Sequence, residues 1–251
     1  MKVYLSPSDQ TDNKYAYGDF TEAEVCRKIA EKTSEYLWGC GIENKVATTG
    51  YDISHRIAES NSYNPDIHIP IHTNAGGGDG TLVLCYNGYK NHKYVVSVYN
   101  AVAACTPTSD DGIRENAELS EIVNTTAIAV YVECEFHDNS NYAKWIVNNV
   151  DALGKAIAKG CCDAFEIPFK TVSNPVEETT PDNLHHVQCG AFKNFNNAEA
   201  LGRMLKKDGY PIYIFSENGL YKVQVGAYSD RKNAETMANN LKKSGYSTYI
   251  C

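Results

Sequence analysis

The stretch IHTNAGGG, at Ile71 to Gly78, is the most informative part of this sequence, because an apolar run ends there and a polar, glycine-rich loop follows. Isoleucines alternate with other residues between positions 67 and 71, which predicts a strand with one buried face. His72 therefore lies at the end of a strand, and Asn74 and the glycines allow a ligand to approach the backbone closely. His68, deeper in the same strand, is interpreted as a core or supporting histidine.

A second stretch of this kind is VECEFHDN, at Val132 to Asn139. Glu133 ends the apolar run IAVYV, and a carboxylate in apolar surroundings has a raised pKa, which suits a general base. Glu135 points to the same side by strand alternation and is the second candidate, because the strand is expected to end at Glu133. Residues 137–139 are expected to form a turn that caps the next helix rather than to supply a catalytic histidine.

The start of the first long helix supplies another carboxylate. Thr21 and Glu24 fit a capping box, in which each side chain bonds the backbone of the other residue. This structural role for Glu24 leaves Glu22 free to point outward. Glu22 and His72 together are two candidate ligands of a divalent metal, but catalytic zinc commonly has three protein ligands.

Strand-like and helix-like segments alternate through the first two thirds of the chain. This alternation predicts an α/β domain with a largely buried sheet, whose ligands bind at the strand ends where both stretches lie. Expected strands are 2–5, 46–48, 66–71, 80–86 and 127–133, and expected helices are 21–37, 52–61, 91–104 and 148–165.

Composition indicates a folded protein, and the first residues indicate that it has no export signal. The chain has 251 residues, of which 43% are apolar, enough for one large domain and a small one. The first residues show no signal peptide, and no apolar run approaches the roughly 20 residues needed to cross a bilayer. Nine cysteines are present, an odd number with no CxxC pair, so we expect reduced and mostly buried thiols.

The chain is expected to divide into a domain at residues 1–168, a linker at 169–183 and a second domain at 184–251. The linker is polar and contains two prolines. The second domain contains a repeat: residues 186–214 align without gaps to residues 222–250, with 14 identities in 29 positions. Each unit has a strand–helix–strand pattern, so the pair predicts a small α+β domain of βαββαβ topology with a four-stranded antiparallel sheet.

In residues 1–167 the motifs VYLSPS, TEAE, ISHRIAESN, DIHIPIHTNAGGGDGT, LSEIVNTTAIAVYVE and FHDN follow one another in order. In this order they resemble the zinc-dependent N-acetylmuramoyl-L-alanine amidases of phage endolysins and bacterial autolysins. The resemblance implies a mixed sheet flanked by helices. It also implies Zn²⁺ as cofactor, with Glu22 and His72 as ligands, Glu133 as catalytic base and Glu121 in support.

The sequence departs from the family at the first zinc ligand. Relatives carry a histidine in the loop after the first strand, whereas SPSDQTDNKYAYG contains none. In similar endolysins that histidine corresponds to Asp12, and Asp9 is the alternative. Aspartate oxygen binds zinc at about 2.0 to 2.2 Å, so the site is expected to survive, with weaker activation of water or another metal preference.

The repeated second domain resembles SPOR domains, which bind peptidoglycan glycan strands. Gln188 and Gln224 occupy identical positions in the two repeats and are candidate glycan contacts. The topology is also used by RNA-binding sheets. However, residues 184–251 hold nine Lys or Arg against five Asp or Glu in a chain of net charge −8, which is only a modest positive charge. Together with the attached amidase-like domain, this modest charge favours the wall, so we expect no nucleic-acid partner. We also expect no membrane insertion, because no apolar run is long enough to cross a bilayer.

The leading hypothesis is a modular lytic amidase of peptidoglycan, with Arg56 and Asn74 as substrate contacts and both the glycan strands and the stem peptide as partners. Tethering to a wall-binding domain raises the local concentration of the catalytic domain. Such an enzyme, made in the cytoplasm, would act on the wall after release, as phage endolysins or autolysins do. The alternatives are a non-catalytic wall-binding protein with a degenerate metal site, and a metallohydrolase acting on a different peptide or amide.

Overall fold

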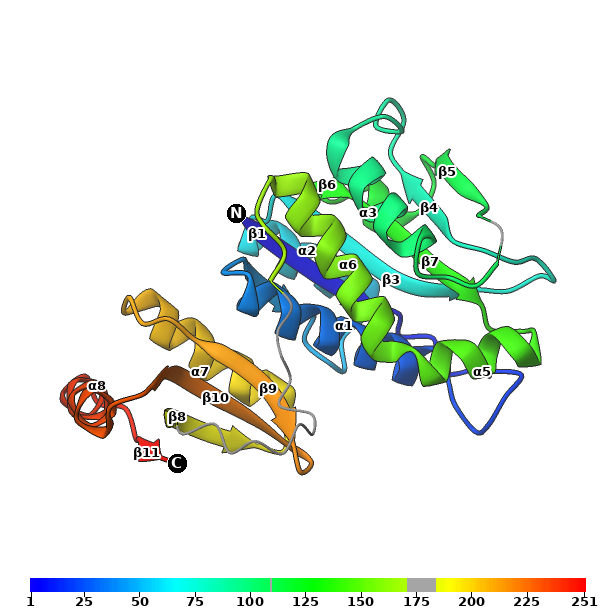
Figure 1. Ribbon diagram of the computed structural model, residues 1–251. Coiled ribbons are helices and arrows are strands. Elements are labelled where there is room, and N and C mark those ends of the chain that lie inside the picture. Colours follow the sequence, from blue (N-terminus) through cyan, green and yellow to red (C-terminus); the bar gives the residue numbers. More distant parts are fainter. Residues whose placement is uncertain (109, 171–183) are drawn as a thin grey trace. The chain divides into compact units, whose positions relative to one another are not determined.

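The computed structural model describes residues 1–108, 110–170 and 184–251, which form two compact units, Met1–Lys170 and Thr171–Cys251 (Figure 1). The predicted linker at 169–183 lies, from residue 171 onward, outside the described residues. Within the described part of the chain, no helix is both long and apolar enough to cross a membrane.

The first unit is built on a seven-stranded mixed sheet. Strands β2, β1, β3, β7, β4 and β5 lie side by side in this order, and β6 pairs with β3. Neighbouring strands are parallel except β4 and β7, which are antiparallel. The strands are β1 (Lys2–Pro7), β2 (Glu43–Val46), β3 (Ile67–Asn74), β4 (Leu82–Cys85), β5 (Gly112–Glu115), β6 (Ile128–Ala129) and β7 (Tyr131–Phe136).

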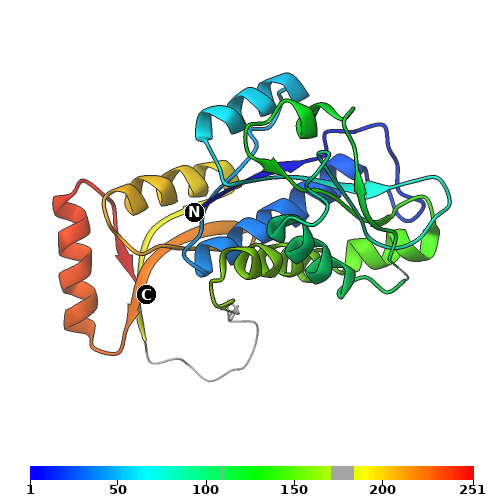
Figure 2. The same cartoon turned by 90° about the horizontal axis from the view of Figure 1, so that it is seen from above.

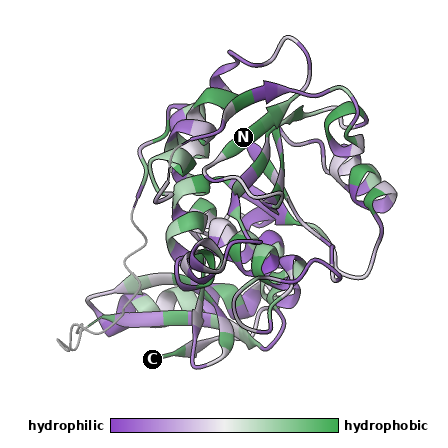
Figure 3. Ribbon diagram, turned by 90° about the vertical axis from the view of Figure 1, so that its right-hand side faces the viewer, coloured by the Kyte–Doolittle hydropathy of each residue, from purple (hydrophilic) through white to green (hydrophobic). Residues whose placement is uncertain are grey.

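Helices cover both faces of this sheet, as the sequence predicts. Helices α1 (Glu22–Gly39), α3 (Lys93–Ala103) and α6 (Val150–Phe165) pack together on one face. Helices α2 (Ile53–Tyr63) and α4 (Ser120–Val123) lie on the other face (Figure 2). The helices carry bands of apolar and polar residues (Figure 3), as helices that cover a sheet on one side do. The fold is therefore the expected mixed sheet flanked by helices.

Two glycines allow α6 to approach its neighbours closely. A Cβ atom at Gly154 would lie 2.6 Å from Cβ of Lys32 in α1, and one at Gly160 would lie 2.6 Å from Cα of Val98 in α3. Real Cβ atoms do not come this close, so larger residues at these two positions would push the helices apart. This packing supports α1, whose first turn carries Glu22.

The central strands differ from expectation at their ends. Strand β7 continues to Phe136 and does not end at Glu133, because Val132, Cys134 and Phe136 are buried and extend the apolar face of the strand. Helix α5 (Ser140–Asn148) follows directly. Its N-cap is Asn139, whose side chain accepts hydrogen bonds from the amides of residues 141 and 142, which confirms the predicted capping turn.

The second unit has the predicted βαββαβ order. Its four-stranded antiparallel sheet has the strand order β11-β8-β10-β9. The elements are β8 (His185–Phe192), α7 (Phe195–Lys207), β9 (Tyr213–Glu217), β10 (Leu220–Tyr228), α8 (Arg231–Lys243) and β11 (Tyr249–Ile250). Helices α7 and α8 pack on the sheet with small and aliphatic residues such as Ala198, Leu205, Ala238 and Leu241. Across both units all nine cysteines are free thiols, and only Cys251 is exposed.

Candidate functional site

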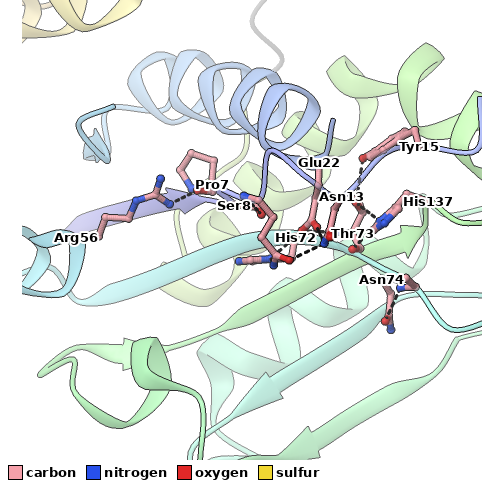
Figure 4. A network of polar contacts seen from close by, with 12 residues as sticks. Pro7, Ser8, Asn13, Tyr15, Glu22, Arg56, His72, Thr73, Asn74 and His137 are labelled. Atoms are coloured by element: carbon pink, nitrogen blue, oxygen red, sulfur yellow. Dashed lines mark hydrogen bonds and ion pairs between the residues drawn. The ribbon is translucent and has the colours of Figure 1, made fainter. Parts of the chain in front are cut away.

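The carboxylate of Glu22 and the imidazole of His72 meet at the end of β3. His72 Nδ1 lies 2.8 Å from Glu22 Oε1, and the two residues are 7% and 1% exposed (Figure 4). The predicted capping box is present, because Thr21 and Glu24 exchange hydrogen bonds between side chain and backbone. Glu22 is therefore free to reach β3, although it turns inward to His72 and not into solvent.

Each member of this pair stabilises the charged form of the other. Burial alone would raise the pKa of Glu22, but the hydrogen bond and charge of His72 lower it below its usual value. Burial alone would lower the pKa of His72, but the hydrogen bond that His72 donates to Glu22 and the charges of Glu133 and Glu22 raise it. A site that holds one negative and one basic group in this way is suited to bind a cation in place of the shared proton.

Glu133 lies beside this pair on the neighbouring strand. It is the register partner of His72 in the parallel pairing of β3 and β7. Its Oε2 is buried without a hydrogen-bond partner. Burial raises the pKa of Glu133 to about 7, and the charge of His72 opposes part of this rise. A carboxyl group with this pKa can both take and return a proton near neutral pH.

Glu135, the second candidate base, is occupied by structural contacts. Its Oε1 accepts hydrogen bonds from the amides of Gly80 at 2.9 Å and Phe136 at 3.0 Å, and its Oε2 accepts one from Thr108 at 2.6 Å. The side chain is fully buried. Because its oxygens are satisfied inside the protein, Glu135 holds the loop before β4 and is poorly placed to accept a proton from water.

A pocket of about 180 Å³ opens at His72 on the face of the sheet covered by α2 and α4. The ring of Tyr131 stacks on the imidazole of His72, with 4.6 Å between ring centroids, and forms one wall. A larger pocket of about 650 Å³ adjoins it, since Asp9 and Arg56 line both. His72 therefore borders a space that is open to a ligand, and Glu22 and Glu133 lie next to His72.

The residues present fit a divalent metal only in part. Glu22 and His72 are suitable donors in mutual contact, and Glu133 has an unpartnered oxygen nearby. Yet among residues 1–108, 110–170 and 184–251 no group of three or more His, Cys, Asp or Glu side chains is arranged to hold a metal ion. Asp12 is exposed, and Asp9 pairs with Arg56 at 3.8 Å. The structure does not bring the third predicted ligand to the other two.

Neutral amides surround the pair instead, and the sequence analysis missed them. Asn13 Nδ2 donates to Glu22 Oε2 at 2.8 Å and to Gln10 Oε1 at 2.5 Å. Gln10 Nε2 lies 3.5 Å from His72 Nδ1. The polar loop between β1 and α1 indicated ligands, but uncharged amides are not typical zinc donors, so the residue types in the loop predicted only its aspartates as ligands.

The glycine loop after β3 is held by side chains of the protein itself. The amides of Gly76 and Gly77 donate to Asp138 at 2.8 and 2.9 Å, and Asn74 Oδ1 accepts from the amide of Ala75. His137 is buried against the strand, where its Nδ1 contacts Thr73. These groups shape the loop beside the site. The expectation that Asn74 contacts the substrate stays a prediction.

The other predicted residues have defined positions. Arg56 is buried, donates from Nη1 to the carbonyl of Pro7 at the end of β1, and has no partner at Nε. Glu121, predicted to act in support, contacts the side chains of Ser6 and His68. In the second unit, Gln188 and Gln224 are register partners on β8 and β10 and are half-buried.

Comparison with known families gives two matches that together span most of the chain. A family described as N-acetylmuramoyl-L-alanine amidase matches residues 4–163, and the SPOR domain family matches residues 181–250. The first match contains the β1–α1 loop, Glu22, His72 and Glu133.

Similar proteins agree with these matches. The sporulation-specific N-acetylmuramoyl-L-alanine amidase of Bacillus subtilis (strain 168) is 26% identical over 218 residues, which span 84% of this chain and 82% of that protein. The catalytic domain of CwlV, an amidase from Bacillus (Paenibacillus) polymyxa var. colistinus, has a TM-score of 0.60 at 17% identity, over 66% of this chain and 99% of that one. The catalytic domain of the CD27L endolysin has a TM-score of 0.55 at 18% identity, over 68% and 99%. At these identities the two structures support the fold.

Proposed function

Because the chain belongs to the N-acetylmuramoyl-L-alanine amidase family and carries a SPOR domain, we propose that it hydrolyses the amide bond between N-acetylmuramic acid and L-alanine in peptidoglycan. The observation that carries this proposal is the position and state of Glu133. This partly enclosed residue lies next to the Glu22–His72 pair, its pKa is raised by burial, and one of its carboxylate oxygens has no hydrogen-bond partner.

The proposed chemistry uses Glu133 as the proton carrier. Glu133 takes a proton from the attacking water while the water oxygen bonds to the amide carbonyl carbon. Glu133 then returns a proton to the alanine nitrogen as the C–N bond breaks. Glu22 and His72, with Asp12 as the third donor predicted from the sequence, would hold Zn²⁺. A bound zinc ion would supply the Lewis acid that polarises the carbonyl. The products are a free lactyl carboxyl group and a stem peptide with a new amino terminus.

Substrate contacts are proposed on both units. Arg56 lines both pockets beside His72, and Asn74 lies at the rim, so these two residues would contact the muramyl peptide. In the SPOR domain, Gln188 and Gln224 face one another across β8 and β10 and would contact the glycan strand. We propose that the protein acts on the bacterial wall as an endolysin or autolysin, with the SPOR domain holding it there.

The test is analysis of the products released from purified peptidoglycan by the full chain. We expect new alanine amino termini and muramic acid with a free carboxyl group, detected by mass spectrometry. A chelator is expected to stop the reaction, and added zinc to restore it. Cleavage at another bond of the stem peptide would contradict the amidase assignment.

A second candidate function is favoured by the incomplete set of metal ligands. A chain that does not retain zinc would be a non-catalytic wall-binding protein. Such a protein would sediment with purified walls but release no products from them at any zinc concentration. Wall binding that depends on Gln188 and Gln224, measured with the double alanine variant, is expected in both cases and so does not distinguish them.

A further inference from the structure

Tyr131 lines the pocket at His72 with a hydroxyl group that the protein itself does not use. The residue is only 8% exposed and forms one wall of the pocket of about 180 Å³. Within residues 1–108, 110–170 and 184–251 its hydroxyl makes no hydrogen bond, and it is not one of the unpartnered polar atoms sealed from solvent. Enclosed tyrosine hydroxyls usually have a hydrogen-bond partner. This one is therefore free to donate to a ligand in the pocket.

Packing fixes the ring that carries this hydroxyl. The ring stacks on the imidazole of His72, with 4.6 Å between ring centroids, and it packs in an apolar cluster with Ile122 and Ala129. Tyr131 also lies two residues before Glu133 on β7, so strand alternation places both side chains on the same face of the sheet. A fixed donor and the proposed proton carrier thus come from one strand, beside the same histidine.

The other side-chain donors that line this pocket are less suited to a ligand. Arg56 donates to a backbone carbonyl and pairs with a half-exposed aspartate. The amide of Gln10 contacts other side chains through both its oxygen and its nitrogen, and Ser120 is exposed. Tyr131 therefore offers the pocket a donor that is both enclosed and free.

The proposed reaction needs such a donor at one atom. When water attacks an amide, negative charge develops on the carbonyl oxygen. A fixed donor aimed at this oxygen stabilises the transition state more than the ground state. A phenol hydroxyl keeps its proton at neutral pH, so it can donate throughout the reaction.

We propose that Tyr131 is a catalytic residue, whose hydroxyl donates a hydrogen bond to the carbonyl oxygen of the scissile amide as that oxygen becomes negative. This inference rests on the proposed function, because it adds a group to the same reaction. As the water oxygen bonds to the carbonyl carbon, the π electron pair moves to the carbonyl oxygen, and the proton stays on Tyr131. As the C–N bond breaks, this pair restores the C=O bond, and the alanine nitrogen takes its proton from Glu133.

The test compares wild type with Tyr131→Phe, using the full chain supplied with zinc and a soluble muramyl peptide. The substitution removes only the hydroxyl and leaves the ring on His72. We expect kcat to fall about 10²-fold, with KM and the affinity for zinc changed less than about twofold.

Tyr4→Phe is the matched control. Tyr4 stacks on His68 of the same strand, with 5.3 Å between ring centroids, but its hydroxyl donates to Glu59 at 2.6 Å. The control loses the same atom outside the pocket, and its kcat is expected to stay within about twofold of wild type. Thermal unfolding checks that the variants fold. If Tyr131→Phe does not fold, Tyr131→Leu, which also removes the hydroxyl, takes its place.

A second measurement does not depend on turnover. In a phosphinate analogue of N-acetylmuramoyl-L-alanine, a tetrahedral, negatively charged group replaces the amide carbonyl and resembles the transition state. Calorimetric titration is expected to show about tenfold or more weaker binding of this analogue to Tyr131→Phe, and no comparable loss in Tyr4→Phe.

The outcomes separate this inference from the proposed function. An unchanged kcat in Tyr131→Phe overturns the inference and leaves the amidase proposal intact. A fall in kcat with an equal loss of zinc affinity also overturns it, because Tyr131 would then act only through His72. A wild-type chain that cleaves no muramyl peptide overturns both.

Discussion

Two buried histidine–carboxylate pairs lie on the same strand, and their difference separates a reactive site from a structural one. His72 pairs with Glu22 at 2.8 Å, and His68 pairs with Glu121 at 3.2 Å. Four residues separate the histidines along β3, or roughly 13 Å at the rise of a strand. Each imidazole also stacks on a tyrosine ring, Tyr131 for His72 and Tyr4 for His68. The two pairs are thus alike in composition and in their immediate packing.

They differ in the groups that lie beside the histidine. The second ring nitrogen of His68 contacts Ser60 at 2.8 Å, Glu121 also contacts Ser6, and His68 is fully enclosed. The pocket of about 180 Å³ is lined by one member of each pair, His72 and Glu121, but only His72 lies beside Glu133, which has an unpartnered oxygen. A buried polar atom without a partner costs free energy, and such a cost is retained where it serves a function. The unpartnered carboxylate oxygen of Glu133 beside His72, and not the presence of a histidine, distinguishes the candidate site.

The largest expected effect is on catalysis, at the carboxylate beside His72. Glu133→Gln is expected to lower the rate of amide hydrolysis by about 10²–10⁴-fold, because it removes the proton carrier at nearly unchanged shape. The measurement is the initial rate of muropeptide release. Glu135→Gln is the matched control from the same strand and is expected to retain most of the rate if the variant folds. Equal losses in the two variants would show that strand integrity, and not the base, had been tested.

The next effect distinguishes the two pairs by metal binding. Glu22→Gln is expected to weaken zinc binding by about tenfold or more, because it removes a charged ligand, whereas Glu121→Gln is expected to leave the affinity within about threefold. Calorimetric titration of the metal-free protein measures both. A comparable loss in the two variants would mean that the His68 pair belongs to the same functional unit as the His72 pair.

The smallest expected effect is on stability, at the satisfied pair. Burial alone would raise the pKa of Glu121, but the hydrogen bond and charge of His68 and the hydrogen bond of Ser6 lower it below 4.5. The stability contributed by this carboxylate is thus present above pH 4.5 and is lost as the pH falls through its lowered folded-state pKa. Glu121→Gln is expected to reduce the free energy of unfolding by about 1–2 kcal/mol at pH 7.

Denaturant unfolding of wild type and Glu121→Gln in the absence of metal measures this difference. The difference is expected to shrink as the pH is lowered below 4.5, because the unfolded wild-type chain then binds a proton at Glu121. The shrinkage is complete below the lowered folded-state pKa, where both folded proteins carry a neutral side chain at this position. A difference that is independent of pH would indicate that shape, and not charge, sets the contribution of Glu121.

Local patterns in the sequence predicted much of this molecule. The isoleucines of β3 predicted its buried face, Thr21 and Glu24 predicted the start of α1, and the 36-residue repeat predicted the order of strands and helices in the second unit. Each of these features depends on residues close together in the chain. The end of β7 was placed too early, because a carboxylate was expected to end a strand that in fact continues past it.

The candidate site was predicted as residue types and not as contacts. His72 and Glu133 were chosen from their places at the ends of apolar segments and Glu22 from its place at the start of a helix. The structure brings Glu22 to His72 and pairs His72 with Glu133. The neutral amides of Gln10 and Asn13 carried no signal in the sequence, because an amide is common in any polar loop. Their contacts depend on how the loop after β1 folds over the end of β3.

The sequence alone therefore determined most of the segments that form strands and helices, although not β5 and α4. It also determined where the chain repeats and which side chains are available for acid–base or metal chemistry. Hydrophobic periodicity and capping are local, so they can be recognised along the chain. Only the tertiary structure decided that Glu135 is satisfied and Glu133 is not, and that Gln10, rather than Asp12, faces His72. These differences depend on burial and on hydrogen bonds between distant residues, which exist only when the sheet and its loops are assembled.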